Sequence, residues 1–172
     1  MAKMTMGTSI FAILPILDSD MLPTSNMEVV NLGCVKGINV GDNQAEQVDV
    51  TCLEAFARQY EAGIETPGTS SLTLDADPSI NQHIRLYRAT KTVNGKRPTI
   101  KFAVGWSDGT SIPTLATDSD GNTDFTLPTD RTWNRFDGYV AGFPFNFQVG
   151  AAVTSEVSIQ NTGESNWYPK AA

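Results

Sequence analysis

Apolar and polar residues alternate with a period of two along the last third of the chain, which is typical of β-strands. A first run extends from Tyr139 to Gly150 and a second from Val153 to Ile159. We expect two antiparallel strands, each with one face in a core and the other in solvent. The more apolar faces carry Tyr139, Ala141, Phe143, Phe145, Phe147 and Val149 in the first run, and Val153, Ser155, Val157 and Ile159 in the second.

Shorter stretches of the same kind predict further strands. Their expected ranges are 8–14, 28–40, 47–53, 70–75 and 99–106. The strands at 28–40 and 47–53 would form a hairpin through a turn at 41–43, which would make Cys34 and Cys52 cross-strand neighbours. Two free thiols that serve as small apolar packing groups fit a reducing compartment better than a disulfide. In the last strand we expect Ile100, Phe102, Val104 and Trp106 inward, and Lys101, Ala103 and Gly105 outward.

One segment changes to a helical period. Asp77 is a suitable N-cap and Pro78 suits the first helical position. Ile80, Ile84 and Tyr87 then recur at helical spacing. The sequence therefore predicts a single helix over residues 77–90, with His83, the only histidine, packed or half-exposed at the margin of its apolar face.

The stretch between the predicted hairpin and the strand at 70–75 has no clean strand period. It contains Phe56 and Tyr60 among charged residues, so it is either a short helix with these aromatics on one face or an irregular loop. We treat residues 41–68 as one long charged loop. Loops of this length are usually functional.

Composition indicates one mainly β domain over residues 1–172, with Gly and Pro spread along the chain as turn residues. The net charge of −7, without a run of basic residues, argues against tight binding of nucleic acid. The apolar run from Ile10 to Leu17 is too short for a membrane span and is interrupted by Pro15. Neither a signal peptide nor a membrane segment is expected, so assembly in a reducing cytoplasm is the default.

The candidate chemistry is sparse. A lone histidine cannot build a usual zinc site. The acidic segment from Asp118 to Asp124 departs from the calcium-loop pattern, because Gly121 is displaced and Thr129 stands where a bidentate Glu belongs. We interpret it as a polar turn. No nucleophile motif or phosphate loop occurs, so we predict no catalytic, cofactor or metal site and no enzymatic activity.

Taken together, the order of segments over about residues 28–165 resembles that of the lambda-like tail-tube family, the major tail proteins of long-tailed bacteriophages (siphoviruses). The segments that carry the resemblance are KFAVGWSDGT at 101–110 and the strands at 136–163. The resemblance implies a β-sandwich that closes into a barrel-like ring on oligomerisation, with one helix packed at the side. Residues 110–131 are longer than the family core requires.

The family resemblance also implies a function. Hexameric rings would stack into the tail tube, through which DNA passes without tight binding during ejection into the host cell. Tape-measure, tail-terminator and distal tail proteins are the implied partners, and the protein would assemble in the bacterial cytoplasm and reside in the virion tail. The 41–68 loop is the candidate contact between subunits or rings. Its candidate residues are Glu54, Phe56, Arg58, Tyr60 and Glu61.

Two alternatives remain open from the sequence. A β-sandwich carbohydrate-binding module could use Trp106, Trp133, Trp167 and Tyr168 as stacking platforms, although Trp106 is expected inward and the others are scattered. The tube subunit of a contractile injection or secretion system would share the fold and the ring.

Overall fold

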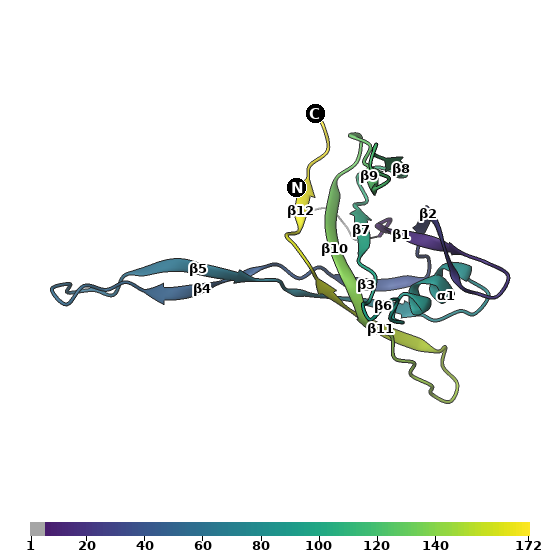
Figure 1. Ribbon diagram of the computed structural model, residues 1–172, viewed down its shortest axis with the longest axis horizontal. Coiled ribbons are helices and arrows are strands. Elements are labelled where there is room, and N and C mark those ends of the chain that lie inside the picture. Colours follow the sequence, from purple (N-terminus) through teal and green to yellow (C-terminus); the bar gives the residue numbers. More distant parts are fainter. Residues whose placement is uncertain (1–5) are drawn as a thin grey trace.

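The computed structural model describes residues 6–172, and it is mainly antiparallel β-structure (Figure 1). Its largest sheet has eight strands in the order β2-β1-β7-β10-β11-β6-β3, with β12 also paired to β10. Two separate hairpins, β4–β5 and β8–β9, and helix α1 complete the described chain. The bounds are β1 Ser9–Leu17, β2 Pro23–Asn31, β3 Val35–Asn39, β4 Gln44–Asp49, β5 Tyr60–Thr66, β6 Thr69–Asp75, α1 Asn81–Arg88, β7 Ile100–Gly105, β8 Thr114–Thr117, β9 Thr123–Thr126, β10 Trp133–Gly142, β11 Thr154–Asn161 and β12 Asn166–Tyr168.

A single large hydrophobic core lies inside the curved sheet. It joins side chains from both halves of the strand order, such as Leu14 of β1 and Leu72 of β6, with Leu86 of α1. Phe102 of β7 stacks on Phe136 of β10, with ring centroids 5.1 Å apart. Because strands distant in the sheet share this core, the sheet folds over it like a sandwich, and the predicted mainly β class with one helix is confirmed.

A second, smaller core covers the opposite face of β1 and β7. Ala103, expected to face outward, is completely buried there beside Phe11, Trp133 and Phe125. Phe125 comes from the β8–β9 hairpin, which is formed by the segment 110–131. The outward assignment of Ala103 and Gly105 is therefore wrong, because this hairpin and a buried Arg131 cover what the strand period alone would leave in solvent.

The strands at 8–14, 70–75 and 153–159 are confirmed as β1, β6 and β11, and Val157 and Ile159 are buried as expected. The first run of the last third is different. Strand β10 ends at Gly142, and next to the predicted run its buried positions are Phe136, Gly138 and Val140 rather than the Tyr139 face. Trp133, at the start of β10, is buried in the second core. A register shift between Val140 and Gly142 ends the regular pairing with β11. The alternation that continues to Val149 belongs to an irregular segment, which pairs with β11 at a single bridge between Asn146 and Thr154.

Helix α1 begins at Asn81, four residues later than predicted. The Asp77 carboxylate does not cap it, because it accepts hydrogen bonds from the backbone N–H and hydroxyl of Ser79, which form a separate turn. This bonding also lowers the pKa of Asp77. His83 is 4% exposed, with Nε2 2.9 Å from the Leu32 carbonyl oxygen, so the packed histidine is confirmed. Arg85, also buried, donates to the carbonyl oxygens of Leu14 and Pro15 and joins α1 to β1.

The predicted hairpin between 28–40 and 47–53 is wrong. Strand β2 pairs with β1, β3 pairs with β6, and β4 pairs with β5. Cys34 and Cys52 are both free and both exposed, so they are neither cross-strand neighbours nor packing groups. Strand period does not specify a partner, and a strand pairs with whichever neighbour the rest of the core places beside it.

Candidate assembly interface

Residues 41–68 form a long two-stranded arm instead of a helix or an irregular loop. Strands β4 and β5 pair from Gln44–Thr66 to Asp49–Tyr60, and the tip comprises residues 50–59. Figure 1 shows the arm projecting from the sheet along the longest axis of the molecule. Every residue of β4 is exposed, and in β5 only Gly63 is partly covered. An isolated two-stranded hairpin has little stability of its own in water.

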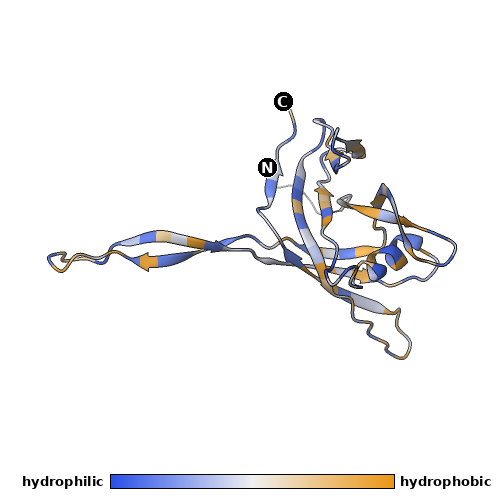
Figure 2. Ribbon diagram, in the orientation of Figure 1, coloured by the Kyte–Doolittle hydropathy of each residue, from blue (hydrophilic) through white to orange (hydrophobic). Residues whose placement is uncertain are grey.

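Large apolar side chains lie uncovered on this arm. Leu53 and Phe56 at the tip are fully exposed, and Ile64 and Tyr60 of β5 are largely or half exposed. Figure 2 shows apolar stretches along the arm with no other element beside them. A group of exposed apolar residues rimmed by charges is typical of a protein–protein contact.

All five residues predicted for this contact lie on the outer part of the arm and are exposed. Glu54, Phe56 and Arg58 are in the tip, and Tyr60 and Glu61 begin β5. Arg58 Nη1 donates to the Tyr60 hydroxyl at 3.4 Å. Sequence reasoning found these residues through the two aromatics in a polar stretch, but it missed Leu53 and Ile64 because the strand geometry that exposes them was not recognised.

Hydrogen bonds close the tip. Val50 N–H donates to the Gln59 carbonyl oxygen at 3.0 Å, and Gln59 N–H donates to Thr51 Oγ1 at 2.9 Å. The Asp49 carboxylate accepts from both the hydroxyl and the backbone N–H of Thr51. Because these bonds favour the charged carboxylate, they lower the pKa of Asp49. The tip thus keeps a defined shape without a core.

At its root the arm is held by two buried polar residues, Asn161 and Ser70. Asn161 Nδ2 donates to the Gly41 carbonyl oxygen at 2.9 Å, and Asn161 N–H donates to the Gly68 carbonyl oxygen at 3.1 Å. Ser70 Oγ donates to Asn161 Oδ1 at 2.8 Å and accepts from Gly41 N–H at 3.0 Å. Both ends of the arm, at Gly41 and Gly68, therefore bind Asn161, which is supported by Ser70. Asn161 and Ser70 are 2% and 1% exposed.

The two glycines at the root permit the legs to pass close to the backbone. A Cβ on Gly41 would lie 2.0 Å from the Thr69 carbonyl oxygen, and one on Gly68 would lie 2.3 Å from the Asp42 carbonyl oxygen. Only glycine fits at such distances. The root fixes where the arm leaves the body and in which direction.

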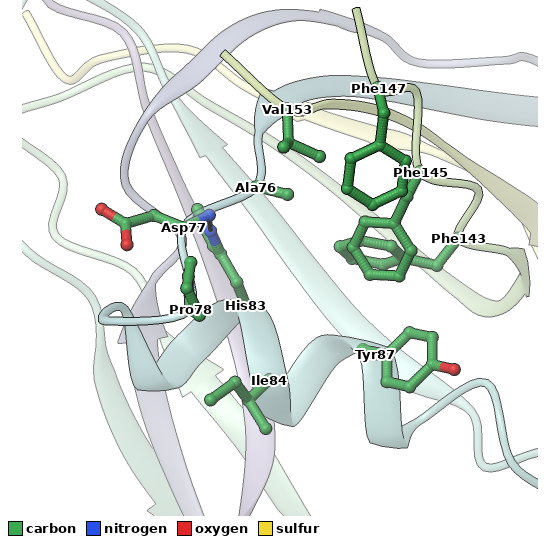
Figure 3. A pocket seen from close by; sticks show the side chains of 10 residues that line it. All are labelled: Ala76, Asp77, Pro78, His83, Ile84, Tyr87, Phe143, Phe145, Phe147 and Val153. Atoms are coloured by element: carbon green, nitrogen blue, oxygen red, sulfur yellow. Dashed lines mark hydrogen bonds between the residues drawn. The ribbon is translucent and has the colours of Figure 1, made fainter.

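The body offers an apolar cavity of about 320 Å³ between α1 and the segment 143–153, shown in Figure 3. Tyr87 of α1 contacts Phe143 and Phe145, with ring centroids 5.7 and 5.6 Å apart, and Phe147 lies beyond Phe145 at 6.3 Å. Burial decreases along this row from Phe143 to Phe147, which is 76% exposed. These rings belong to the stretch that the sequence assigned to a continuous strand.

The aromatic platform of a carbohydrate-binding module is not formed. Trp133 is 1% exposed and donates Nε1–H to the Pro128 carbonyl oxygen. Trp106 stacks against Trp167 with centroids 5.6 Å apart. Since Trp133 is in the core and one face of Trp167 is occupied by Trp106, the alternative function is not favoured.

Across residues 6–172 no group of three or more His, Cys, Asp or Glu side chains is arranged to hold a metal ion. The polar turn predicted at 118–124 is confirmed over residues 118–122, between β8 and β9, whereas Asp124 lies in β9 opposite Ala116. Asp118 itself accepts hydrogen bonds from the backbone N–H groups of Asp120 and Asn122, and these bonds lower its pKa. Over the same range, no helix is long and apolar enough to cross a membrane.

Comparison with known proteins identifies the class. The sequence model of the family described as phage tail tube, TTP, lambda-like, matches residues 1–171. "Structural protein 3" of Pseudomonas phage PAJU2 is 42% identical over 142 residues, which are 83% of this chain and 84% of that protein. The chain therefore belongs to the lambda-like phage tail-tube family, as its segment order suggested, and is a structural protein of the virion tail.

Solved structures share the fold at low identity. A chain of the native gene transfer agent virion has a TM-score of 0.58 at 14% identity, with 96% of this chain and 98% of that chain covered. The SPP1 tail tube has a TM-score of 0.53 at 12% identity, with 95% and 78% covered. A chain of the PVC extracellular contractile injection system, in the sheath-tube complex, has a TM-score of 0.55 at 6% identity, with 92% and 86% covered. The contractile system thus shares the fold alone, while the sequence relatives are phage proteins.

Proposed function

We propose that copies of this tail-tube protein, each acting as one domain over residues 1–172, associate into hexameric rings that stack into a tube. The phage genome passes through this tube into the host cell. The observation that carries the proposal is the arm, a rooted hairpin with large apolar side chains in solvent. Such an arm gains stability only when another molecule covers it.

The arm bridges neighbouring subunits or rings in this proposal, through Glu54, Phe56, Arg58, Tyr60 and Glu61. Burial of a large side chain such as Phe56 contributes about 1.5–3 kcal/mol that a solvated arm does not gain. A head-to-tail contact of this kind, made by one surface on a different surface of the next copy, repeats without limit and suits a tube. Pairing between subunits would also cover the outer edges of β2 and β3, which are the ends of the sheet.

We further propose a passive role without catalysis. Each copy carries a net charge of −7, so carboxylates that face the lumen would repel phosphate and let DNA pass without tight binding. Tape-measure, tail-terminator and distal tail proteins are the partners that the family implies. A density map of the assembled tube with a basic or plugged bore would contradict DNA conduction.

The experiment that tests the arm replaces Phe56 and Tyr60 together with serine. Because both side chains are exposed, the double variant should remain a folded monomer by circular dichroism, yet form no tubes by negative-stain microscopy. The matched control replaces Leu22 and Ile112, which are exposed apolar residues of the body, with serine, and should assemble normally. Normal tubes from the arm variant would overturn the proposal.

A further inference from the structure

The chain carries a second uncovered apolar surface besides the arm. It is the aromatic cavity of Figure 3, whose outer rings, Phe145 and Phe147, are 46% and 76% exposed. His83 lines its inner end, but its Nε2 is engaged by the Leu32 carbonyl oxygen, so the open part of the cavity is nearly all carbon. Such a surface accepts an apolar side chain rather than a polar ligand.

A basic segment follows the helix beside this cavity. Residues 88–97 include four cations and no acid: Arg88, Lys91, Lys96 and Arg97. Lys91 Nζ lies 4.8 Å from the centre of the Tyr87 ring, which itself lines the cavity. Arg97 donates to the carbonyl oxygens of Val140 and Ala141. Among the described residues none of these four cations forms an ion pair.

The arm has the opposite charge. Residues 41–68 contain six acidic side chains against the single base Arg58. One chain therefore presents an apolar tip on an acidic hairpin and, elsewhere, an apolar cavity beside a basic segment. A head-to-tail polymer requires two such unlike and complementary surfaces on every copy.

We propose that the cavity between α1 and the segment 143–153 is the receptor for the arm tip of a second copy of this chain. Leu53 and Phe56 insert beside Phe145 and Phe147, and the acidic arm lies against residues 88–97. This inference rests on the proposed function, because it specifies where the arm binds. Figure 1 shows the arm tip and the 143–153 segment on opposite sides of the body, so the contact is made between copies.

The native Cys52 makes this contact measurable, since it is exposed in the arm tip next to Leu53. In a Cys34→Ser background, Phe147→Cys adds one thiol at the cavity rim. Assembled tubes are treated with a short bis-maleimide and run on a denaturing gel. We expect dimers and a ladder of higher multimers, with the 52–147 linkage identified by mass spectrometry.

Two further variants keep the experiment decisive. Val149→Cys places the thiol on a fully exposed side chain of the same segment, so it tests the contact even if position 147 is needed for assembly. Ile112→Cys is exposed but lies away from the cavity lining, and it should give at least tenfold less linked dimer. Equal linkage from position 112 would overturn the proposal.

A second measurement distinguishes this proposal from the broader proposal that the arm bridges copies. Tubes of the Cys34→Ser variant are treated with a bulky maleimide, and the extent of reaction at Cys52 is measured. Protection of Cys52 with linkage to 147 or 149 supports both proposals. Protection without either linkage shows that the arm binds another surface or protein. That result overturns the proposal that the cavity is the receptor and leaves arm bridging intact. Full reactivity of Cys52 in the tubes overturns both.

Charge reversal provides an independent check. Lys91→Glu should slow tube growth at low salt several-fold, and Glu54→Lys or Glu61→Lys in the same chain should restore it. The control is Lys170→Glu, on the C-terminal segment, where the ammonium group donates to the Asp108 carbonyl oxygen. Arg135→Glu is not a suitable control, because Arg135 forms an ion pair with Asp124 within the body. No effect of Lys91→Glu at any ionic strength would remove the basic segment from the contact.

Discussion

The body of the protein and its arm differ in where their stability comes from. In the body, strands distant in sequence bury side chains in two cores, and Phe102, Phe136 and Leu72 are almost completely inaccessible. In the arm, two strands adjacent in sequence pair with one another and bury nearly nothing. The body is therefore able to fold as a single copy, while the apolar side chains of the arm are stabilised only by a contact that a single chain does not contain.

The largest expected difference between the two regions is in their response to the loss of one aromatic ring. Phe102→Ala leaves a cavity in the stacked pair with Phe136 and should lower the free energy of unfolding by about 3–5 kcal/mol. Phe56→Ala removes a solvated ring and should change it by less than about 0.5 kcal/mol. Chemical denaturation of the monomers measures both. A similar loss from both variants would mean that the arm is packed in the free protein.

The root of the arm should give a smaller effect. Asn161→Ala leaves the buried Ser70 hydroxyl without an acceptor and the Gly41 carbonyl oxygen without its Asn161 donor, which costs about 1–3 kcal/mol. It should also increase hydrogen exchange in β4 and β5 and reduce tube formation, because the arm loses its direction. The control is Asn166→Ala, an exposed asparagine of β12. Unchanged exchange in the arm would show that Asn161 acts only on the body.

Acid titration should distinguish the tip from the body without affecting folding. Hydrogen bonds from Thr51 lower the pKa of Asp49 below 3.8, so their stabilisation of the tip is complete above that pH and is lost as the pH falls through the folded value. Thr51→Val should raise the titration midpoint of Asp49 measured by NMR. The midpoint of Asp118, whose lowered pKa depends on Asn122, should not move. An unchanged Asp49 midpoint would rule out the Thr51 hydroxyl as a cause of the lowered pKa.

The smallest expected effect is that of calcium on the β8–β9 turn. Asp118 already accepts backbone hydrogen bonds, so the thermal midpoint in chelator and in millimolar calcium should coincide. A ligand at a hundredfold excess over its dissociation constant would add about 2.7 kcal/mol and raise the midpoint by several degrees. Such a rise, lost in Asp118→Ala, would revive an ion site in the body.

Much of the body could be predicted from the sequence, because burial of one strand face leaves a period of two that does not depend on the partner strand. Strands β1, β6, β7 and β11 and the existence of one helix follow from that period. The start of the helix at Asn81 could not be predicted, since the Asp77 carboxylate could equally cap a helix or close a local turn. The composition of the 41–68 segment indicated an interaction site, but its acidic, aromatic sequence left its conformation open.

The sequence by itself determined the family, the mainly β class and the segment that carries the candidate contact residues. The tertiary structure decided which strands pair, because pairing depends on the whole core rather than on any strand's own period. It decided that Ala103 is covered by the β8–β9 hairpin and that strand β10 ends at Gly142, inside the alternating run that begins at Tyr139. It also placed Asn161 under both legs of an arm more than ninety residues earlier in the chain, a contact that sequence spacing cannot encode.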